Sequence, residues 1–146
     1  MTNTKKPMQQ PIGYWLNRTD QALTKAMNNV LQAFGITRIG WQILNVLHQH
    51  ASLSEEEVYA LLEANADHAE LVNTVDDLVV RGWVERTKQA AATSERQMRL
   101  TEEGRATHEQ LQSHITQFRQ RSLQGISAEE CQTAVHVLER IVRNLE

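Results

Sequence analysis

Basic side chains gather in residues 81–101 of this chain. The whole chain has a net charge of −3, but this stretch holds five lysines and arginines against two glutamates, a local charge of +3. The five cations are Arg81, Arg86, Lys88, Arg96 and Arg99. Guanidinium and ammonium groups form strong hydrogen bonds with phosphates, so a local excess can bind a polyanion that the whole chain would repel. Any contact with nucleic acid is therefore expected here or close by.

Residues 51–80 have the opposite character. They contain eight aspartates and glutamates and no lysine or arginine. Three of these acids follow Ser54, and Ser54 with Glu57 matches the capping box that opens a helix. Carboxylates in a first helical turn are stabilised by the helix dipole by roughly 0.3–1 kcal/mol each. We therefore interpret Glu55, Glu56 and Glu57 as a helix start rather than a metal site.

Histidine and cysteine are not spaced for catalysis or metal binding. His48 and His50 lie two positions apart and His108 and His114 lie six apart, so neither pair shares one helical face. The lone Cys131 falls on an apolar stripe without a basic neighbour, which is typical of an inert core thiol. Phosphate-loop, nucleophile-elbow and zinc-protease motifs are missing from the sequence. The sequence predicts no enzyme activity and no cofactor, with a metal site shared between two copies left as an alternative.

Apolar residues recur at helical spacing along most of the chain, with capping residues and glycines at the ends of each run. Helices are predicted at about 12–34, 37–48, 54–62, 67–81, 101–124 and 127–146. After Gly82 the period changes, which predicts a hairpin of strands 83–86 and 97–100 with an exposed tip. The short link between the third and fourth helices, followed by this hairpin, predicts a winged helix-turn-helix.

The length and the terminal helices predict one domain that pairs with a second copy of itself. A chain of 146 residues is about one domain. Residues 12–34 and 105–146 carry apolar stripes too long for a lobe at 37–101 to cover, and such stripes aggregate unless they are buried. We expect a mainly α fold whose terminal helices intertwine in a homodimer. A single cysteine and no apolar run long enough for a bilayer favour a cytoplasmic protein without a membrane partner.

Three segments together resemble the MarR family of bacterial winged-helix regulators, named for multiple antibiotic resistance. They are the fourth helix leading into RGWVER at 81–86, the hairpin exit RLTEEG at 99–104, and the helix entry TRIGWQ at 37–42. The resemblance covers nearly the whole chain. It implies a homodimer whose two lobes straddle a pseudo-palindromic DNA operator. It also implies a small aromatic or phenolic effector that binds between the dimer region and the lobe and releases the DNA.

The hairpin departs from the pattern of that family. The family usually carries Asp-x-Arg before the Leu-Thr exit, and the arginine enters the minor groove, but Ala92 and Ser94 hold those places here. Arg96 is the nearest basic residue. It either reaches a narrow minor groove, where the negative potential attracts guanidinium, or pairs with Glu95 on a solvated face.

The predicted reading helix, 67–81, also departs from expectation because four acidic residues precede its first arginine. DNA carries one charge per about 1.7 Å of its axis, so such a helix is repelled at long range. Asp76 is expected to pair with a neighbouring arginine such as Arg86. Two hypotheses stay open: a dimeric DNA-binding repressor, or a winged-helix ligand- or protein-binding dimer with weakened or lost DNA binding.

Candidate residues follow for both roles. DNA contacts are predicted for Arg38, His68, Asn73, Thr74, Arg81, Arg86, Lys88 and Arg96. An effector cleft between the first, second and fifth helices is predicted from Trp15, Arg18, Met27 and Trp41. Aromatic residues at helical spacing pack in a core more often than they line a ligand site, and that simpler interpretation stands beside the cleft.

Overall fold

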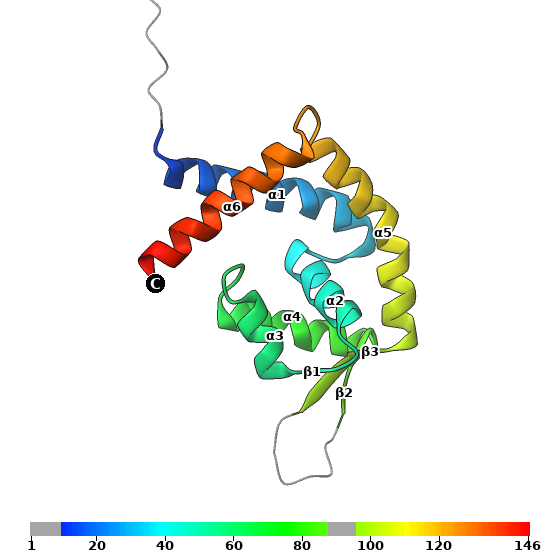
Figure 1. The fold of residues 1–146 in the computed structure, drawn as a ribbon. Coiled ribbons are helices and arrows are strands. Elements are labelled where there is room, and N and C mark those ends of the chain that lie inside the picture. The colour runs from blue at the N-terminus through cyan, green and yellow to red at the C-terminus, as the bar shows by residue number, and fades with distance from the viewer. Residues whose placement is uncertain (1–9, 88–95) are drawn as a thin grey trace, which may run out of the picture.

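The computed structural model describes residues 10–87 and 96–146, and Figure 1 shows their arrangement. Every predicted helix is present, and so are both predicted strands. The elements in chain order are α1 (Ile12–Leu31), a short 3-10 helix (Gln32–Phe34), α2 (Arg38–Gln49), β1 (Leu53–Ser54), α3 (Glu55–Leu62), α4 (His68–Val80), β2 (Val84–Thr87), β3 (Gln97–Leu100), α5 (Glu102–Ser122) and α6 (Ala128–Leu145).

Local capping explains where the helices begin and end. The predicted capping boxes at Ser54 and Ser127 are both confirmed, with each serine hydroxyl accepting the N–H three residues later. Thr37 and Thr101 cap α2 and α5 in the same way. The turn after α1 closes at Gly35, whose φ of 66° lies in the left-handed region that favours glycine. These signals are local, and this is why the sequence predicts the helix boundaries well.

The sheet has three antiparallel strands in the order β1-β3-β2, one more than predicted. Strands β2 and β3 form the hairpin, with Val84 opposite Leu100. The additional strand β1 pairs Leu53 with Met98 on the other side of β3. It has two residues, too few to show an alternating pattern in the sequence. The hairpin is therefore held to the start of α3 as well as to its own second strand.

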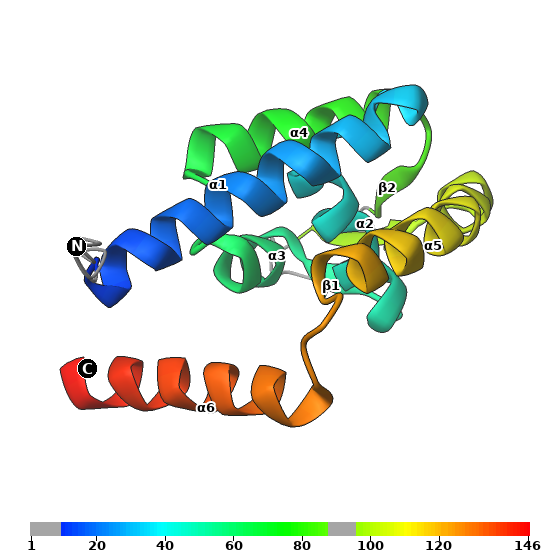
Figure 2. The same cartoon turned by 90° about the horizontal axis from the view of Figure 1, so that it is seen from above.

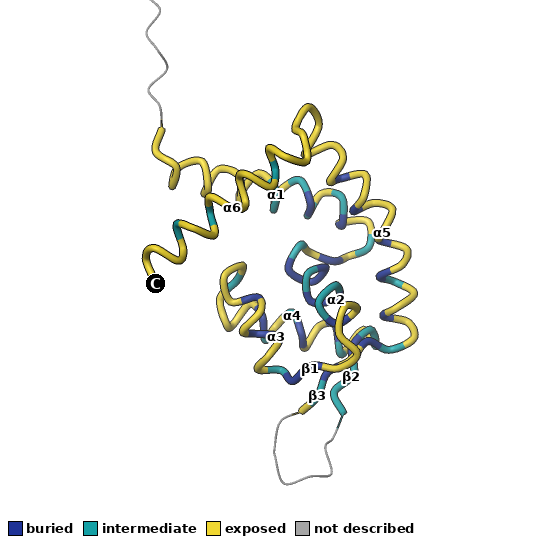
Figure 3. The backbone as a smooth tube through the Cα atoms, in the orientation of Figure 1, coloured by how far each residue is buried: buried dark blue, intermediate teal, exposed yellow. Residues whose placement is uncertain are grey.

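The apolar core lies inside the lobe formed by α2, α3, α4 and the sheet, and it extends to the junction of α1 with α5. Leu44, Val58, Val75 and Met98 from four different elements are fully buried in it. Figure 3 shows these buried stretches in the lobe, while the first turns of α1 and nearly all of α6 are exposed. None of the described helices is long and apolar enough to cross a membrane.

Helix α6 lies apart from the lobe, as the two views in Figures 1 and 2 show, and none of its residues is buried. Its predicted apolar stripe is therefore largely uncovered within one chain. Cys131 on that stripe is half-buried in one chain. The predicted core position of its thiol requires a second copy to cover α6, so it stays a prediction.

A stack of three rings joins α5 to α2. His108 of α5 is only 3% exposed, and its Nε2 lies 3.2 Å from the amide oxygen of Asn45. Its ring lies between those of Trp41 and His48, with centroid distances of 4.7 and 4.0 Å. Burial, and secondly the neighbouring His48, lower the pKa of His108 to about 4. Residue spacing does not predict this pairing, because the two histidines come from different helices.

The buried imidazole predicts a loss of stability in acid. Between pH 6.5 and about 4 the unfolded chain binds a proton at His108 that the folded chain does not. The free energy of unfolding should therefore fall by about 2–3 kcal/mol as the pH is lowered through this window. Urea unfolding at several pH values measures the fall. His108→Gln should reduce it, whereas His136→Gln, at an exposed site on α6, should not; an undiminished fall in His108→Gln contradicts the assignment.

Candidate nucleic-acid interface

Helices α3 and α4 and the hairpin β2–β3 form a winged helix-turn-helix. One face of α4 packs into the core through Leu71, Val75 and Leu78, all of which are fully buried. The spacing of these three residues matches one face of a helix, so the opposite face of α4 is left to solvent. That opposite face and the hairpin are the surfaces available for a long, straight partner such as a duplex.

The exposed side of α4 carries the polar residues predicted to contact base edges. His68 and Asn73 are exposed, and the ring of His68 meets Tyr59 edge-on at 5.0 Å. The hydroxyl of Thr74 donates to the carbonyl of Glu70 at 2.7 Å, so it is already engaged within the helix. Asn73 forms no side-chain hydrogen bond with any described residue. Among these candidates, Asn73 is the most available for a base contact.

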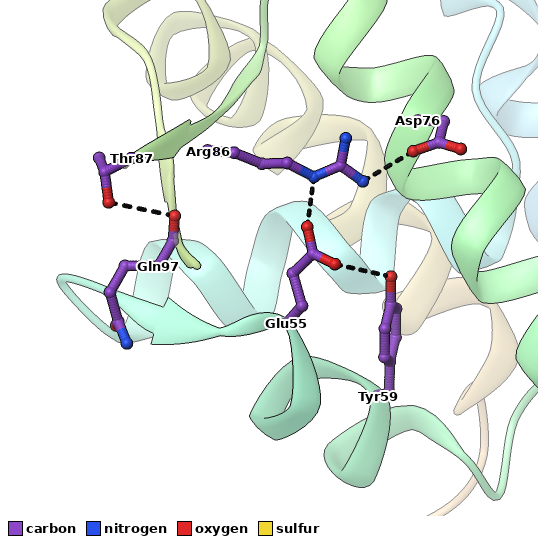
Figure 4. A network of polar contacts seen from close by, with 6 residues as sticks. All are labelled: Glu55, Tyr59, Asp76, Arg86, Thr87 and Gln97. Carbon is purple, nitrogen blue, oxygen red and sulfur yellow. Dashed lines mark hydrogen bonds and ion pairs between the residues drawn. The ribbon is translucent and has the colours of Figure 1, made fainter. Parts of the chain in front are cut away.

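Arg86 joins the hairpin to the helix-turn-helix, as Figure 4 shows. Its Nη2 donates to Asp76 of α4 at 2.7 Å, and its Nε pairs with Glu55 at the start of α3. Hydrogen bonding to Asp76 is the largest cause of a raised pKa for Arg86, with Glu55 adding to it against the effect of burial. The other oxygen of Glu55 accepts from the hydroxyl of Tyr59. The predicted pairing of Asp76 with Arg86 is confirmed.

Arg81 makes a second bridge at the end of α4. Its Nε lies 3.0 Å from Asp77 Oδ2, and its Nη2 donates to the carbonyl of Gly35 at 2.6 Å. The guanidinium also lies over the ring of Trp83, 5.0 Å from the centroid. Asp76 and Asp77 thus each have an arginine counter-ion within the chain. This removes much of the negative charge that the sequence assigned to the middle of α4.

Arg38 is held between α1 and α2. Its Nη1 donates to Asp20 at 2.9 Å and to the hydroxyl of Thr24 at 2.7 Å, and its backbone N–H donates to Asn28. Arg38, Arg81 and Arg86 therefore all serve contacts inside the chain. These partners lie far from the arginines in the sequence or on other elements, so residue spacing gave no signal for most of them.

Of the two predicted hairpin cations that the structure describes, Arg86 and Arg96, Arg96 is the one with an exposed side chain. It has no ion-pair partner among residues 10–87 and 96–146. Its backbone carbonyl accepts the N–H of Glu55 at 3.3 Å, which fixes its place beside the start of α3. The other predicted hairpin positions, Lys88, Ala92, Ser94 and Glu95, lie outside the described residues.

The four predicted effector residues do not come together. Trp15 and Arg18 line an open cleft of about 400 Å³ between α1 and the end of α5. Met27 and Trp41 are buried in the core instead, 7% and 4% exposed. The cleft also includes Phe118 and Arg121 of α5, which were not predicted as site residues. Their spacing of three on one helix was the available signal. No group of three metal-ligating side chains lies together among the described residues.

The comparisons with known proteins place this arrangement among transcription regulators. No protein-family model matches the chain. The reduced form of MarR from Escherichia coli is 26% identical, with 90% of this chain and 96% of that chain aligned and a TM-score of 0.73. A cysteine-to-serine mutant of that MarR, complexed with operator DNA, is 24% identical over 90% of this chain and 93% of that chain, with a TM-score of 0.79.

A MarR family transcriptional regulator from Silicibacter pomeroyi also aligns, over 95% of this chain and 96% of that chain, with 21% identity and a TM-score of 0.79. The resemblance to the MarR family and the winged-helix fold predicted from the sequence are confirmed. The proteins that this chain resembles are transcription regulators rather than enzymes.

The bridge of Arg86 predicts a measurable contribution to stability. Arg86→Gln leaves the partly buried carboxylate of Glu55 and the exposed carboxylate of Asp76 without a cation, so the free energy of unfolding should fall by about 1 kcal/mol. Urea denaturation measures it. Arg99→Gln is the matched control, because Arg99 forms one ion pair, with Glu85, and its own side chain is more exposed than that of Arg86. In the control the free energy of unfolding should fall by about 0.5 kcal/mol or less. An equal fall in both variants would show that the two ion pairs of Arg86 do not stabilise the fold more than an exposed pair does.

Proposed function

We propose that this chain is a DNA-binding transcription regulator that represses by occupying an operator. The observation that carries the proposal is the winged helix-turn-helix itself, in the same fold as a MarR solved with operator DNA. In this proposal α4 enters the major groove with Asn73 toward the base edges. The hairpin extends to the flanking minor groove, with Arg96 as its contact with the backbone.

The internal ion pairs support binding despite the overall negative charge. Asp76 and Asp77 are matched by Arg86 and Arg81, so α4 presents a weaker field to DNA than its sequence suggests. Among the described residues of the helix-turn-helix and hairpin, Arg96 alone is a lysine or arginine without an ion-pair partner, so the affinity should depend strongly on a small number of phosphate contacts.

The exposed apolar surfaces of α1 and α6 support a homodimer. Ile12 and Trp15 of α1 and Val135, Val142 and Leu145 of α6 are all at least half-exposed. We infer that two copies cover these surfaces mutually and hold the lobes at a fixed spacing. An operator with two half-sites about 34 Å apart would match a two-fold axis through that interface.

The cleft between α1 and α5 is the proposed effector site. Trp15 and Phe118 offer apolar ring surface, and Arg18 and Arg121 offer cations for a carboxylate or phenolate. The cleft lies between α1 and α5, next to the surfaces proposed to form the dimer. A small aromatic anion bound there would change the angle between α1 and α5, and hence the spacing of the two lobes in the dimer.

A second candidate function is a winged-helix dimer that binds a ligand or protein without DNA. The observation that favours it is the internal use of Arg38, Arg81 and Arg86, which leaves few cations for phosphates. One measurement distinguishes the two candidates. Only a DNA-binding regulator should select duplexes that share a palindromic sequence from a random library.

Binding to DNA is the first test. Duplexes selected from a random library should share a pseudo-palindrome, and fluorescence anisotropy should show affinity falling with salt. Arg96→Ala should weaken binding about tenfold and reduce the salt slope by about one. Arg119→Ala, on the exposed side of α5, is the control and should leave binding unchanged. No bound duplex at low salt would favour the second candidate.

Release by an effector is tested with benzoate, which should release the DNA from the wild type but not from Arg18→Gln.

The oligomeric state is the second test. Val135→Glu places a carboxylate on the apolar stripe of α6, so light scattering after gel filtration should show a shift from dimer to monomer. Thr133→Glu adds the same charge to the opposite face of the helix and should leave a dimer. A wild-type monomer, or a Val135→Glu dimer, would refute the proposed interface.

A further inference from the structure

A second cavity lies at the other end of α5, away from the proposed effector cleft. It has a volume of about 510 Å³ and forms where the end of α2 meets the first turns of α5. Leu47 of α2 and Leu100 of β3 supply apolar surface. The volume falls within the range of small-molecule sites, roughly 300–1,000 Å³. The cavity therefore has room for a ligand of the size of an amino acid.

Two opposite charges line one wall of this cavity. Arg105 and Glu109 come from successive turns of α5. They form no ion pair with each other, and neither pairs with any other residue in the described ranges 10–87 and 96–146. An arginine four residues before a glutamate is the less favourable order for a helical pair, so this separation is physically reasonable. The cavity thus offers a free cation and a free anion about one helical turn apart.

The same cavity includes an aromatic surface. His48 lines it and stacks by one face on His108, at 4.0 Å and 12° between the planes. No other described ring packs against His48, so the stack that begins at Trp41 ends there. A flat side chain could extend this stack by lying against the remaining face of His48.

We propose that this cavity binds a zwitterionic α-amino acid with a flat aromatic side chain. Its carboxylate accepts hydrogen bonds from Arg105, and its ammonium group donates to Glu109. Its ring packs on His48 above the apolar surface of Leu47 and Leu100. This site is separate from the effector cleft in position and in ligand chemistry, and its occupancy does not depend on DNA.

The test is calorimetric titration with L-phenylalanine, without DNA, of the full chain carrying Arg18→Gln, which keeps aromatic carboxylates out of the effector cleft. Two probes each lack one charge: phenylpropionate has no ammonium group, and phenethylamine has no carboxylate. Each should bind at least about tenfold more weakly than L-phenylalanine, the loss expected when one charge-assisted hydrogen bond is removed. No binding of L-phenylalanine up to about 10 mM would overturn the proposal.

Substitutions of Arg105 and Glu109 test whether L-phenylalanine binds at the wall of the cavity that carries these two residues. Arg105→Gln should weaken L-phenylalanine at least about tenfold and leave phenethylamine unchanged, and Glu109→Gln should have the complementary effect with phenylpropionate. Both residues are exposed, so the variants should fold. Arg119→Gln is the matched control, because Arg119 is an exposed arginine of the same helix that lines neither this cavity nor the effector cleft. Equal losses in Arg105→Gln and Arg119→Gln, or no loss in Arg105→Gln and Glu109→Gln, would overturn the site.

Discussion

The ion pairs of Arg86 with Glu55 and Asp76 tie the hairpin to the middle of α4 and reinforce the β1–β3 pairing that holds the hairpin to the start of α3. The orientation of the hairpin relative to α4 depends on this guanidinium. The same contact also sets the electrostatics, because it matches one of the acids on the exposed side of α4. Arg81 does the same for Asp77 while it anchors the end of α4 to the turn after α1. Arg86 and Arg81 thus both position the elements around α4 and match the negative charges of Asp76 and Asp77.

The sequence predicted the helices and the hairpin well because their signals are local. Ser54, Ser127 and Gly35 mark helix ends through contacts with residues close to them in the chain. Contacts between distant segments were mostly missed. The strand β1 was too short to show a period, and the partners of Arg38 lie on another helix. The ring stack of His48 on His108 brings together two residues whose spacing suggested no relation.

The prediction of binding residues was limited by the same cause. Trp15 and Arg18 share a cleft, as expected, whereas Met27 and Trp41 belong to the core. Periodicity shows that a residue faces inward, but it does not show whether it faces a cavity or a packed neighbour. The arginines illustrate the converse problem. A basic residue near a predicted interface can serve as a counter-ion inside the chain, and only the folded arrangement distinguishes the two roles.

The short strand β1 has a mechanical consequence. Leu53 and Ser54 pair with β3 on the side opposite β2, and the N–H of Glu55 continues that ladder to Arg96. Because β3 is hydrogen-bonded to a strand on each side, the strands of the hairpin cannot move independently of α3. The lobe should therefore move as one rigid body, so any change in its orientation will occur where α1 and α5 join it.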